Sequence, residues 1–269
     1  MRMENNPMEV LTETYSEEEQ RNYAGGFCGF VLLEETQYDL PALLVRLQKE
    51  WQITPLEAPT VQEMKAGNLV FEIPGAMITV EFLPTLIPEG EAVYAARHNA
   101  DWADAVSIAE NHKAHLMAAV LPLGMAPLEA GKVYVKLLSS CLAGEHAMAV
   151  YTSGTVLEPG AYQRETQSMR EGELPIHNWI YLGTYETEAG SNAYTVGMDA
   201  FGKDELEILG SRRSAEELKK FLFDVARHVL VEDITLHGEA LVGFAGDEGL
   251  QIQRRDGVMV EGHSIQIAY

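Results

Sequence analysis

Short apolar runs with the length of buried strands recur along this chain and alternate with longer stretches of helical spacing. This alternation constrains the fold most, because strands and helices with apolar faces must bury those faces against one another. Five strand-like runs occur in the first half: FCGFVLLEE (27–35), NLVFEI (68–73), AMITVEFL (76–83), AHLMAAVLP (114–122) and MAVYTSGTV (148–156). Pro74-Gly75 lies between the second and third runs and predicts a hairpin.

Stretches of helical spacing separate most of these runs. Asp39 is a suitable N-cap for LPALLVRLQKEW, whose leucines form one apolar stripe. Residues 91–113 and 126–143 also have helical spacing, and Asn99 or Asp101 is a possible internal start within the first of these stretches. The resulting order, βαββαβαβ, predicts a sheet with helices packed on it, either doubly wound or ferredoxin-like.

The second half has a different rhythm, with three strand candidates in succession: NWIYLGTYE, NAYTVGMDAFG and DELEIL. Ser214 and Glu217 then form a capping box for an amphipathic helix, and hairpin-like segments follow from Ala240 to Tyr269. We therefore predict an α+β fold of two coupled lobes, each a mixed or antiparallel sheet with packed helices, ferredoxin-like in character. The expected divisions are an acidic flexible tail (1–24), an N-terminal α/β lobe (25–156) and a C-terminal α+β lobe (157–269).

The balance of charge restricts the partners of this chain. It contains 41 acidic and 19 basic residues, which gives a net charge of −22 with neutral histidines. This charge repels phosphate groups, so we expect no direct binding to nucleic acid or to anionic membranes. It favours solubility, and it also accelerates association with a cationic partner. The acidic charge can therefore be interpreted as a means of solubility or, more specifically, as a sign of a basic protein partner.

The first residues and the cysteines indicate the compartment. Residues 1–20 contain six glutamates and lack an apolar core, unlike a secretory leader. Cys28 and Cys141 lie among apolar residues of the kind that bury thiols, so no disulfide framework is indicated. No apolar run approaches the roughly 20 residues of a membrane-spanning helix. We therefore expect a cytoplasmic protein.

The stretch ENHKAHLMA (110–118) raises the question of a metal site, because His112 and His115 are three residues apart. Catalytic zinc needs three protein ligands and structural zinc four, whereas these two histidines flank a transition from helix to strand, where their directions diverge. His112 suits the last helical turn as a cation opposite the helix dipole, and His115 suits the start of a strand. We predict structural roles for both, and no metal or other cofactor.

The remaining chemical motifs are incomplete. LGMAPLEAGKVYV (123–135) has the wrong glycine spacing for a phosphate loop, with Val133 in place of the hydroxyl residue. Cys141 has apolar neighbours that would keep its thiol inert. We interpret the acidic cluster Asp204, Glu205 and Glu207 as a solvated face. No catalytic residue is assigned, and a protein without enzymatic activity is favoured.

Several segments together resemble one protein family: FVLLEETQYDL, HKAHLMAAVL, VYTSGTVLEP, EGELPIHNWIYLGTYE and YTVGMDAFGKDELEIL. Nearly all of the chain after Gly25 is similar to the mainly bacterial family known as domain of unknown function 4261, most specifically from Leu174 to Leu209. The resemblance implies a bacterial, cytosolic setting and contributes no catalytic residue.

We favour a protein-binding function, for example that of an immunity or inhibitor protein that neutralises a basic toxin. Its motivation is the strong acidity together with the incomplete catalytic motifs. Aromatic side chains are frequent at the centres of protein interfaces, and the candidates here are Trp179, Tyr181 and Tyr185.

Two alternatives remain open. One is an enzyme or small-ligand-binding protein whose site lies at the strand ends of the first lobe, where open α/β sheets bind ligands. Its candidate residues are His112, His115, Tyr151 and Glu158. The other is a structural module whose two lobes form a homo-oligomer.

Overall fold

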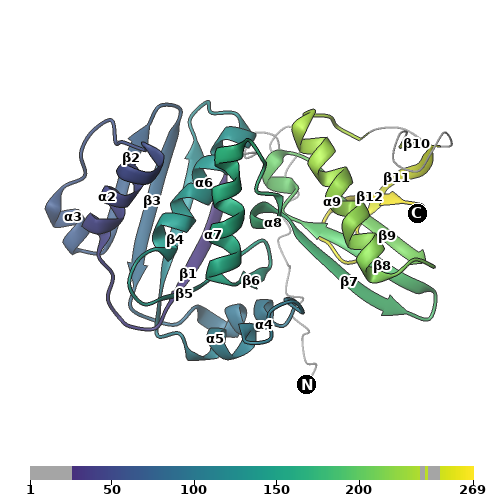
Figure 1. Ribbon diagram of the computed structural model, residues 1–269, viewed down its shortest axis with the longest axis horizontal. Coiled ribbons are helices and arrows are strands. Elements are labelled where there is room, and N and C mark those ends of the chain that lie inside the picture. The colour runs from purple at the N-terminus through teal and green to yellow at the C-terminus, as the bar shows by residue number, and fades with distance from the viewer. Residues whose placement is uncertain (1–25, 237–239, 242–248) are drawn as a thin grey trace, which may run out of the picture.

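Two six-stranded sheets with helices packed on them form the framework of the chain (Figure 1). The computed structural model describes residues 26–236, 240–241 and 249–269. The predicted α+β class, with helices on mixed or antiparallel sheets, is confirmed. The expected tail, residues 1–24, lies outside the described residues, and the division at residues 156 and 157 stays a prediction.

The first sheet, sheet A, has the strand order β2-β3-β4-β1-β5-β6, and all of its neighbouring strands are antiparallel. The four central strands, β3-β4-β1-β5, have the order of a ferredoxin-like sheet, in which two split βαβ units interleave. The six strands are β1 (Phe27–Leu33), β2 (Asn68–Ile73), β3 (Ala76–Leu83), β4 (Ala114–Pro122), β5 (Ala147–Thr152) and β6 (Thr155–Leu157).

One face of sheet A is covered by α2 (Leu40–Trp51), α6 (Pro127–Leu142) and α7 (Pro159–Ser168) (Figure 1). The N-cap of α2 is confirmed, since Asp39 accepts a hydrogen bond from the Ala42 N–H at 2.9 Å. Cys141 of α6 is fully buried, and burial raises the pKa of its thiol to about 12, as its apolar neighbours predicted. The short α3 (Val61–Lys65) lies beside β2, and η2 (Met169–Glu171) follows α7.

In the described part of the chain, the opposite face of sheet A is covered by helices at one end only. There η1 (Pro88–Gly90), α4 (Glu91–Ala96) and α5 (Ala105–Asn111) pack on the sheet. The predicted helical stretch 91–113 is therefore two helices, and the break between them contains both candidate internal starts, Asn99 and Asp101, although α5 begins only at Ala105. The chain leaves the helix before Asn99, whose side-chain oxygen accepts the Asp101 N–H at 3.1 Å. Such local side-chain bonds compete with helical ones. Cys28 is exposed on the uncovered part of this face, contrary to the expected burial.

The second sheet, sheet B, has the strand order β10-β11-β12-β9-β8-β7, in which only β9 and β12 are parallel neighbours among the described strands. Its strands are β7 (Tyr181–Thr187), β8 (Gly190–Val196), β9 (Glu205–Ser211), β10 (Ala240–Leu241), β11 (Leu250–Asp256) and β12 (His263–Ile267). The helix α9 (Ala215–Val231) packs on one face and begins with the predicted capping box of Ser214 and Glu217. None of the helices described here has the length and apolar character required to cross a membrane.

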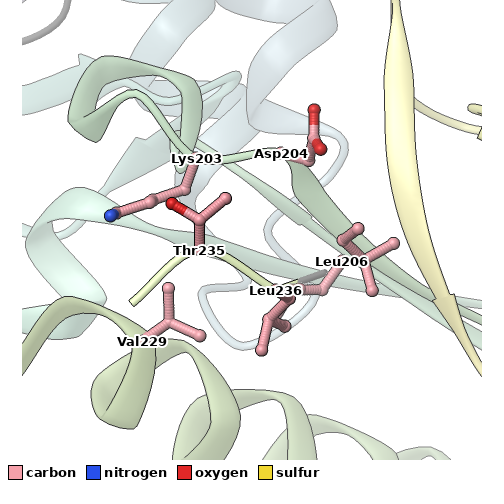
Figure 2. Close-up of a pocket in the computed structure, with 7 residues that line it drawn as sticks. Lys203, Asp204, Leu206, Val229, Thr235 and Leu236 are labelled. Carbon is pink, nitrogen blue, oxygen red and sulfur yellow. The ribbon is translucent and has the colours of Figure 1, made fainter. Parts of the chain in front are cut away.

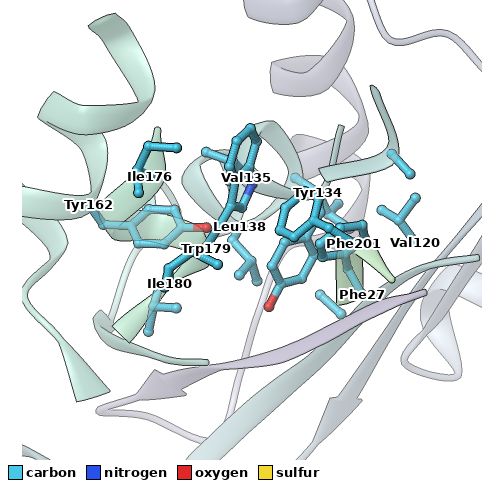
Figure 3. Packing of buried hydrophobic residues seen from close by; sticks show 14 of the residues in the cluster. Phe27, Val120, Tyr134, Val135, Leu138, Tyr162, Ile176, Trp179, Ile180 and Phe201 are labelled. Carbon is cyan, nitrogen blue, oxygen red and sulfur yellow. The ribbon is translucent and has the colours of Figure 1, made fainter. Parts of the chain in front are cut away.

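A continuous hydrophobic core joins the two halves of the chain. Two short elements lie at the junction, α8 (Ile176–Trp179) and η3 (Asp199–Phe201). The ring of Trp179 lies 5.1 Å from that of Phe201, which in turn lies 5.1 Å from Phe27 of β1 (Figure 3). Gly131 of α6 permits this approach, because a Cβ there would come within 3.1 Å of both phenylalanine rings. The two sheets are thus coupled through closely packed aromatic side chains.

Candidate functional site

His112 lies directly after α5 and is buried. Its Nδ1 lies 2.6 Å from the carbonyl oxygen of Ala109, and its Nε2 accepts the Ile87 N–H at 3.0 Å. Together these bonds require a neutral imidazole that carries its proton on Nδ1. Burial also lowers the pKa of His112. The residue therefore joins helix to strand as the sequence indicates, but it is not the cation that its helix-end position suggested.

His115 and Tyr151 lie on the same face of sheet A, on either side of Phe30. The ring of Phe30 is 5.8 Å from that of His115 and 5.5 Å from that of Tyr151. The Nδ1 of His115 lies 2.8 Å from the Thr85 carbonyl oxygen, and burial lowers its pKa. The Tyr151 hydroxyl donates to Glu91 Oε1 at 2.5 Å, and burial, followed by this carboxylate, raises its pKa. Two of the four small-ligand candidates thus come together through a third ring.

Two cavities occur in the half of the chain that contains sheet B. The first, between Lys203, Val229 and Leu236, has a volume of about 10 Å³, enough for one water molecule (Figure 2). The second is an open depression of about 600 Å³ next to Leu209 and Arg255. Neither is lined by the small-ligand candidates of the first half. The last of those candidates, Glu158, precedes α7 and makes no capping hydrogen bond with its side chain.

Trp179 belongs to the core and not to the surface. It is 2% exposed, and its indole N–H donates to the Gly131 carbonyl oxygen at 3.0 Å. A buried indole usually has such a partner. Of the three aromatic residues considered as contacts for a partner, this one therefore couples the two sheets (Figure 3).

Five rings form a continuous row from α4 to the face of sheet B opposite α9. Successive ring centroids lie 5.0 Å (Tyr94 to His98), 6.4 Å (His98 to Tyr181), 6.1 Å (Tyr181 to Tyr194) and 6.2 Å (Tyr194 to Tyr185) apart. These separations fall in the range of roughly 4.5–7 Å over which aromatic rings attract one another. We call these five residues the aromatic row.

The pairing of β7 with β8 positions the three tyrosines of sheet B. Gly183 of β7 lies opposite Tyr194 of β8, and a Cβ on Gly183 would come within 2.2 Å of the Tyr194 ring. The glycine therefore allows Tyr194 to lie across β7, between Tyr181 and Tyr185. The Tyr181 hydroxyl donates to the His98 carbonyl oxygen at 2.7 Å, which joins the sheet to the turn after α4.

Exposure differs along the aromatic row. Tyr94 is 64% exposed, Tyr181 and Tyr185 are half-buried, and Tyr194 is 9% exposed. The row therefore combines fixed rings with rings that a partner can contact. Sequence reasoning identified Tyr181 and Tyr185. The alternation in NAYTV was a signal for Tyr194, whereas no local pattern connects Tyr94 and His98 to strands so distant in the sequence.

Carboxylates accompany the aromatic row. Burial raises the pKa of Tyr181, with smaller contributions from Tyr194 and from the charge of Asp101. Burial, and then the charge of Glu207, likewise raises the pKa of Tyr185. Asp101 is partly balanced by Lys219 of α9, whose ammonium lies 3.2 Å away. Two carboxylates, Asp101 and Glu207, thus act on tyrosines of the row, in keeping with the acidic composition of the chain.

Two further carboxylates, Glu205 and Glu207, are buried on β9, so the interpretation of this acidic cluster as a solvated face is wrong for both. Glu207 accepts hydrogen bonds from the N–H groups of Val258 and Met259 and from the Ser264 hydroxyl, at 2.7–3.1 Å. This carboxylate therefore holds the loop between β11 and β12.

Glu205 holds the segment that follows β8. It accepts the N–H groups of Gly197 and Met198 at 2.7 and 2.8 Å and the Thr195 hydroxyl at 2.5 Å. Burial raises its pKa to about 7 despite these bonds, which by themselves favour the charged form. Both carboxylates of β9 thus fix loops of sheet B.

Comparison with known families identifies one match. Residues 194–268 match the family model described as Domain of unknown function (DUF4261), which confirms the resemblance over β8 to β12. The matched segment includes Tyr194, Glu205 and Glu207, whereas the rest of the aromatic row lies outside it. Searches of curated proteins and of solved structures found no match.

Proposed function

We propose that this chain is a non-enzymatic protein-binding protein whose partner is basic and contacts the aromatic row. The observation that supports this proposal is the row itself, a set of contiguous rings that includes the exposed Tyr94 and the half-buried Tyr181 and Tyr185, on a chain with a net charge of −22. Tyrosine is enriched at interface centres because it buries a large apolar ring and offers a hydroxyl for hydrogen bonding.

Lysine and arginine side chains of the partner would interact both with the aromatic rings and with the negative charge of this surface. A cation over an aromatic ring gains roughly 0.5–2 kcal/mol, depending on how far water is excluded. The acidic field would accelerate the encounter, and specific contacts with the rings would then slow dissociation. An immunity or inhibitor protein for a basic toxin in a bacterial cytoplasm is the form of this function that we favour.

Affinity capture with the immobilised chain tests this proposal. A basic protein should be retained from a lysate of the source organism in stoichiometric amount at low salt and in smaller amount at moderate salt. The double variant Tyr94→Ala with Tyr185→Ala should lose it. The matched control is Leu56→Ala with Val61→Ala, which truncates two exposed apolar side chains near α3. The proposal would be contradicted if the wild type retained no basic protein, or if the wild type, the tyrosine variant and the control variant retained it equally.

A small-ligand site near His115 and Tyr151 stays a prediction. The contact of both rings with Phe30 is the only feature among the described residues that we find in its favour. Titration of the chain with candidate metabolites, followed by the NMR signals of the His115 ring, would test it.

A further inference from the structure

The free edges of the two sheets differ in how they are protected. An edge strand presents unpaired N–H and C=O groups, and native proteins usually shorten or cover such edges. On sheet A, the Leu56 N–H donates to the Glu72 carbonyl oxygen of β2 at 2.8 Å. At the other edge, the Asn99 side chain donates to the Val156 carbonyl oxygen of β6 at 2.9 Å. On sheet B, the described part of the edge strand β10 has two residues.

The fourth edge, β7, has none of these protections in the part of the chain that the structure describes. It is seven residues long, YLGTYET, and contains neither lysine nor proline. Its pairing with β8 runs from Tyr181 to Thr187 without a register shift. Within the described ranges, no backbone hydrogen bond from outside sheet B reaches these seven residues.

The register indicates which groups of β7 are free. Thr187 and Gly190 flank a two-residue turn and form the last pair of the hairpin, which makes them a hydrogen-bonded pair. Hydrogen-bonded and non-hydrogen-bonded pairs alternate along an antiparallel ladder. Leu182, Thr184 and Glu186 therefore direct their N–H and C=O groups away from β8.

We propose that β7 accepts an extended segment of the basic partner as a seventh strand of sheet B. This inference rests on the proposed function and assigns its mode of recognition. Backbone bonds to a sheet edge provide affinity, and pockets for alternate side chains provide specificity. Alternate side chains of the added strand would lie beside Tyr181 and Tyr185 of the aromatic row, because successive residues of a strand point to opposite faces.

The charge near β7 favours a basic segment over a second copy of this chain as the strand that pairs with this edge. The hairpin 181–190 contains Glu186 and Glu188, both exposed, and no lysine or arginine. Two copies, each with a net charge of −22, would repel one another when their β7 edges pair. Lysine or arginine side chains on the added strand would instead be attracted to these carboxylates.

A model peptide tests strand addition with the full chain. The probe is a seven-residue peptide of alternating lysine and valine with acetylated and amidated ends. Its control has the same sequence with N-methyl groups on the backbone nitrogens of alternate residues, so its charge is unchanged but one edge cannot donate. Calorimetry should show saturable one-to-one binding of the probe, and N-methylation along the bonding edge should weaken it roughly tenfold or more. Hydrogen exchange at Leu182, Thr184 and Glu186 should slow on binding.

Variants of β7 provide the second measurement. Thr184→Pro removes one outward N–H and should weaken probe binding, whereas Thr184→Ala should not. Circular dichroism would show whether the proline variant folds. Should it not fold, Glu186→Lys with Glu188→Lys should weaken binding, and the control Glu50→Lys with Glu57→Lys, with the same net charge, should not.

With the probe peptide, any of four outcomes would overturn strand addition: no probe binding, equal binding of the N-methylated peptide, unchanged binding by the β7 variants, or a wild-type dimer that Thr184→Pro dissociates. The proposed function can fail separately. A natural partner lost from the Tyr94→Ala, Tyr185→Ala variant but retained by Thr184→Pro would sink strand addition and leave the aromatic row as the binding surface.

Discussion

The polar groups of the two sheets differ in how completely they are hydrogen-bonded within the described chain. Around sheet A, His112 uses both ring nitrogens internally, and the edges of β2 and β6 receive hydrogen bonds from Leu56 and Asn99. Sheet B also binds its buried carboxylates tightly, yet no described segment outside the sheet donates a backbone hydrogen bond to the edge of β7, and tyrosine rings stay accessible along the same strand. The difference shows that the edges of sheet A receive hydrogen bonds from neighbouring segments, whereas β7 of sheet B receives none from described segments outside its sheet. The recognition surface that we propose combines this edge with the aromatic row.

The two sheets are coupled through Trp179, and Trp179→Ala should have the largest effect on unfolding free energy. Removing a buried tryptophan typically costs about 3–5 kcal/mol of unfolding free energy, because a cavity remains where the ring was. We expect the single unfolding transition of the wild type to separate into two, since this ring joins Gly131 to Phe201.

Denaturant unfolding would be followed by circular dichroism for both sheets and by fluorescence of Trp51 and Trp102, which lie in the half that contains sheet A. Leu209→Ala, at an exposed position of β9, is the control. Coincident transitions in the Trp179→Ala variant, with a loss below about 1 kcal/mol, would show that the halves do not depend on this contact.

Glu205 should make the stability of sheet B depend on pH. Its folded-state pKa is raised to about 7 from an ordinary value of 4.5, so the fold favours the neutral carboxyl. The stability that this neutral group contributes is fully present below pH 4.5 and is lost as the pH rises through about 7. Glu205→Gln keeps an oxygen for the Gly197 and Met198 N–H groups and carries no charge.

The glutamine variant should therefore exceed the wild type by roughly 3 kcal/mol in unfolding free energy at pH 8 and match it near pH 4. Urea unfolding across this pH range would measure the difference. A constant difference between the two proteins at every pH would refute the raised pKa.

His112→Phe should destabilise the end of sheet A by roughly 1–3 kcal/mol, because the Ile87 N–H and the Ala109 carbonyl lose their partner. The pKa of His112 is lowered by burial, so its contribution is fully present above pH 6.5 and is lost as the pH falls through the lower folded-state pKa. Thermal unfolding at pH 8 and pH 5 would measure both effects. The control is His263→Phe, at an exposed position on β12, which should change neither the stability nor its dependence on pH.

Tyr94→Ala should have the smallest effect on the fold and a large effect on binding. Its side chain is 64% exposed, and surface substitutions of this kind usually change unfolding free energy by less than about 0.5 kcal/mol. If the aromatic row contacts a partner, the same change should lower affinity roughly tenfold or more. Unfolding and binding measured on one preparation would separate the effect on stability from the effect on affinity. A loss of unfolding free energy as large as the loss of binding free energy would refute a surface role for Tyr94.

Local patterns predicted many of the elements and their caps. Asp39, the capping box of Ser214 and Glu217, and the strand 114–122 are found as expected, because each depends on neighbours within a few residues. The helical stretch 91–113 is interrupted around the candidate internal start at Asn99, because this residue bonds to local backbone and to Val156 of β6. The second helix begins at Ala105, later than the sequence indicated. The burial of Glu205 and Glu207 was also missed, because their partners are backbone groups of loops that the sequence does not mark.

The amino-acid sequence by itself determined the α+β class, the positions of most strands and the acidic charge of this chain, since these follow from composition and short-range periodicity. Tertiary structure decided that Tyr94 and His98 meet Tyr181, that Trp179 is buried, and that β7 alone of the longer edges lacks a cover among the described residues. These features arise from contacts between segments far apart in the chain, and local preferences carry no information about such contacts.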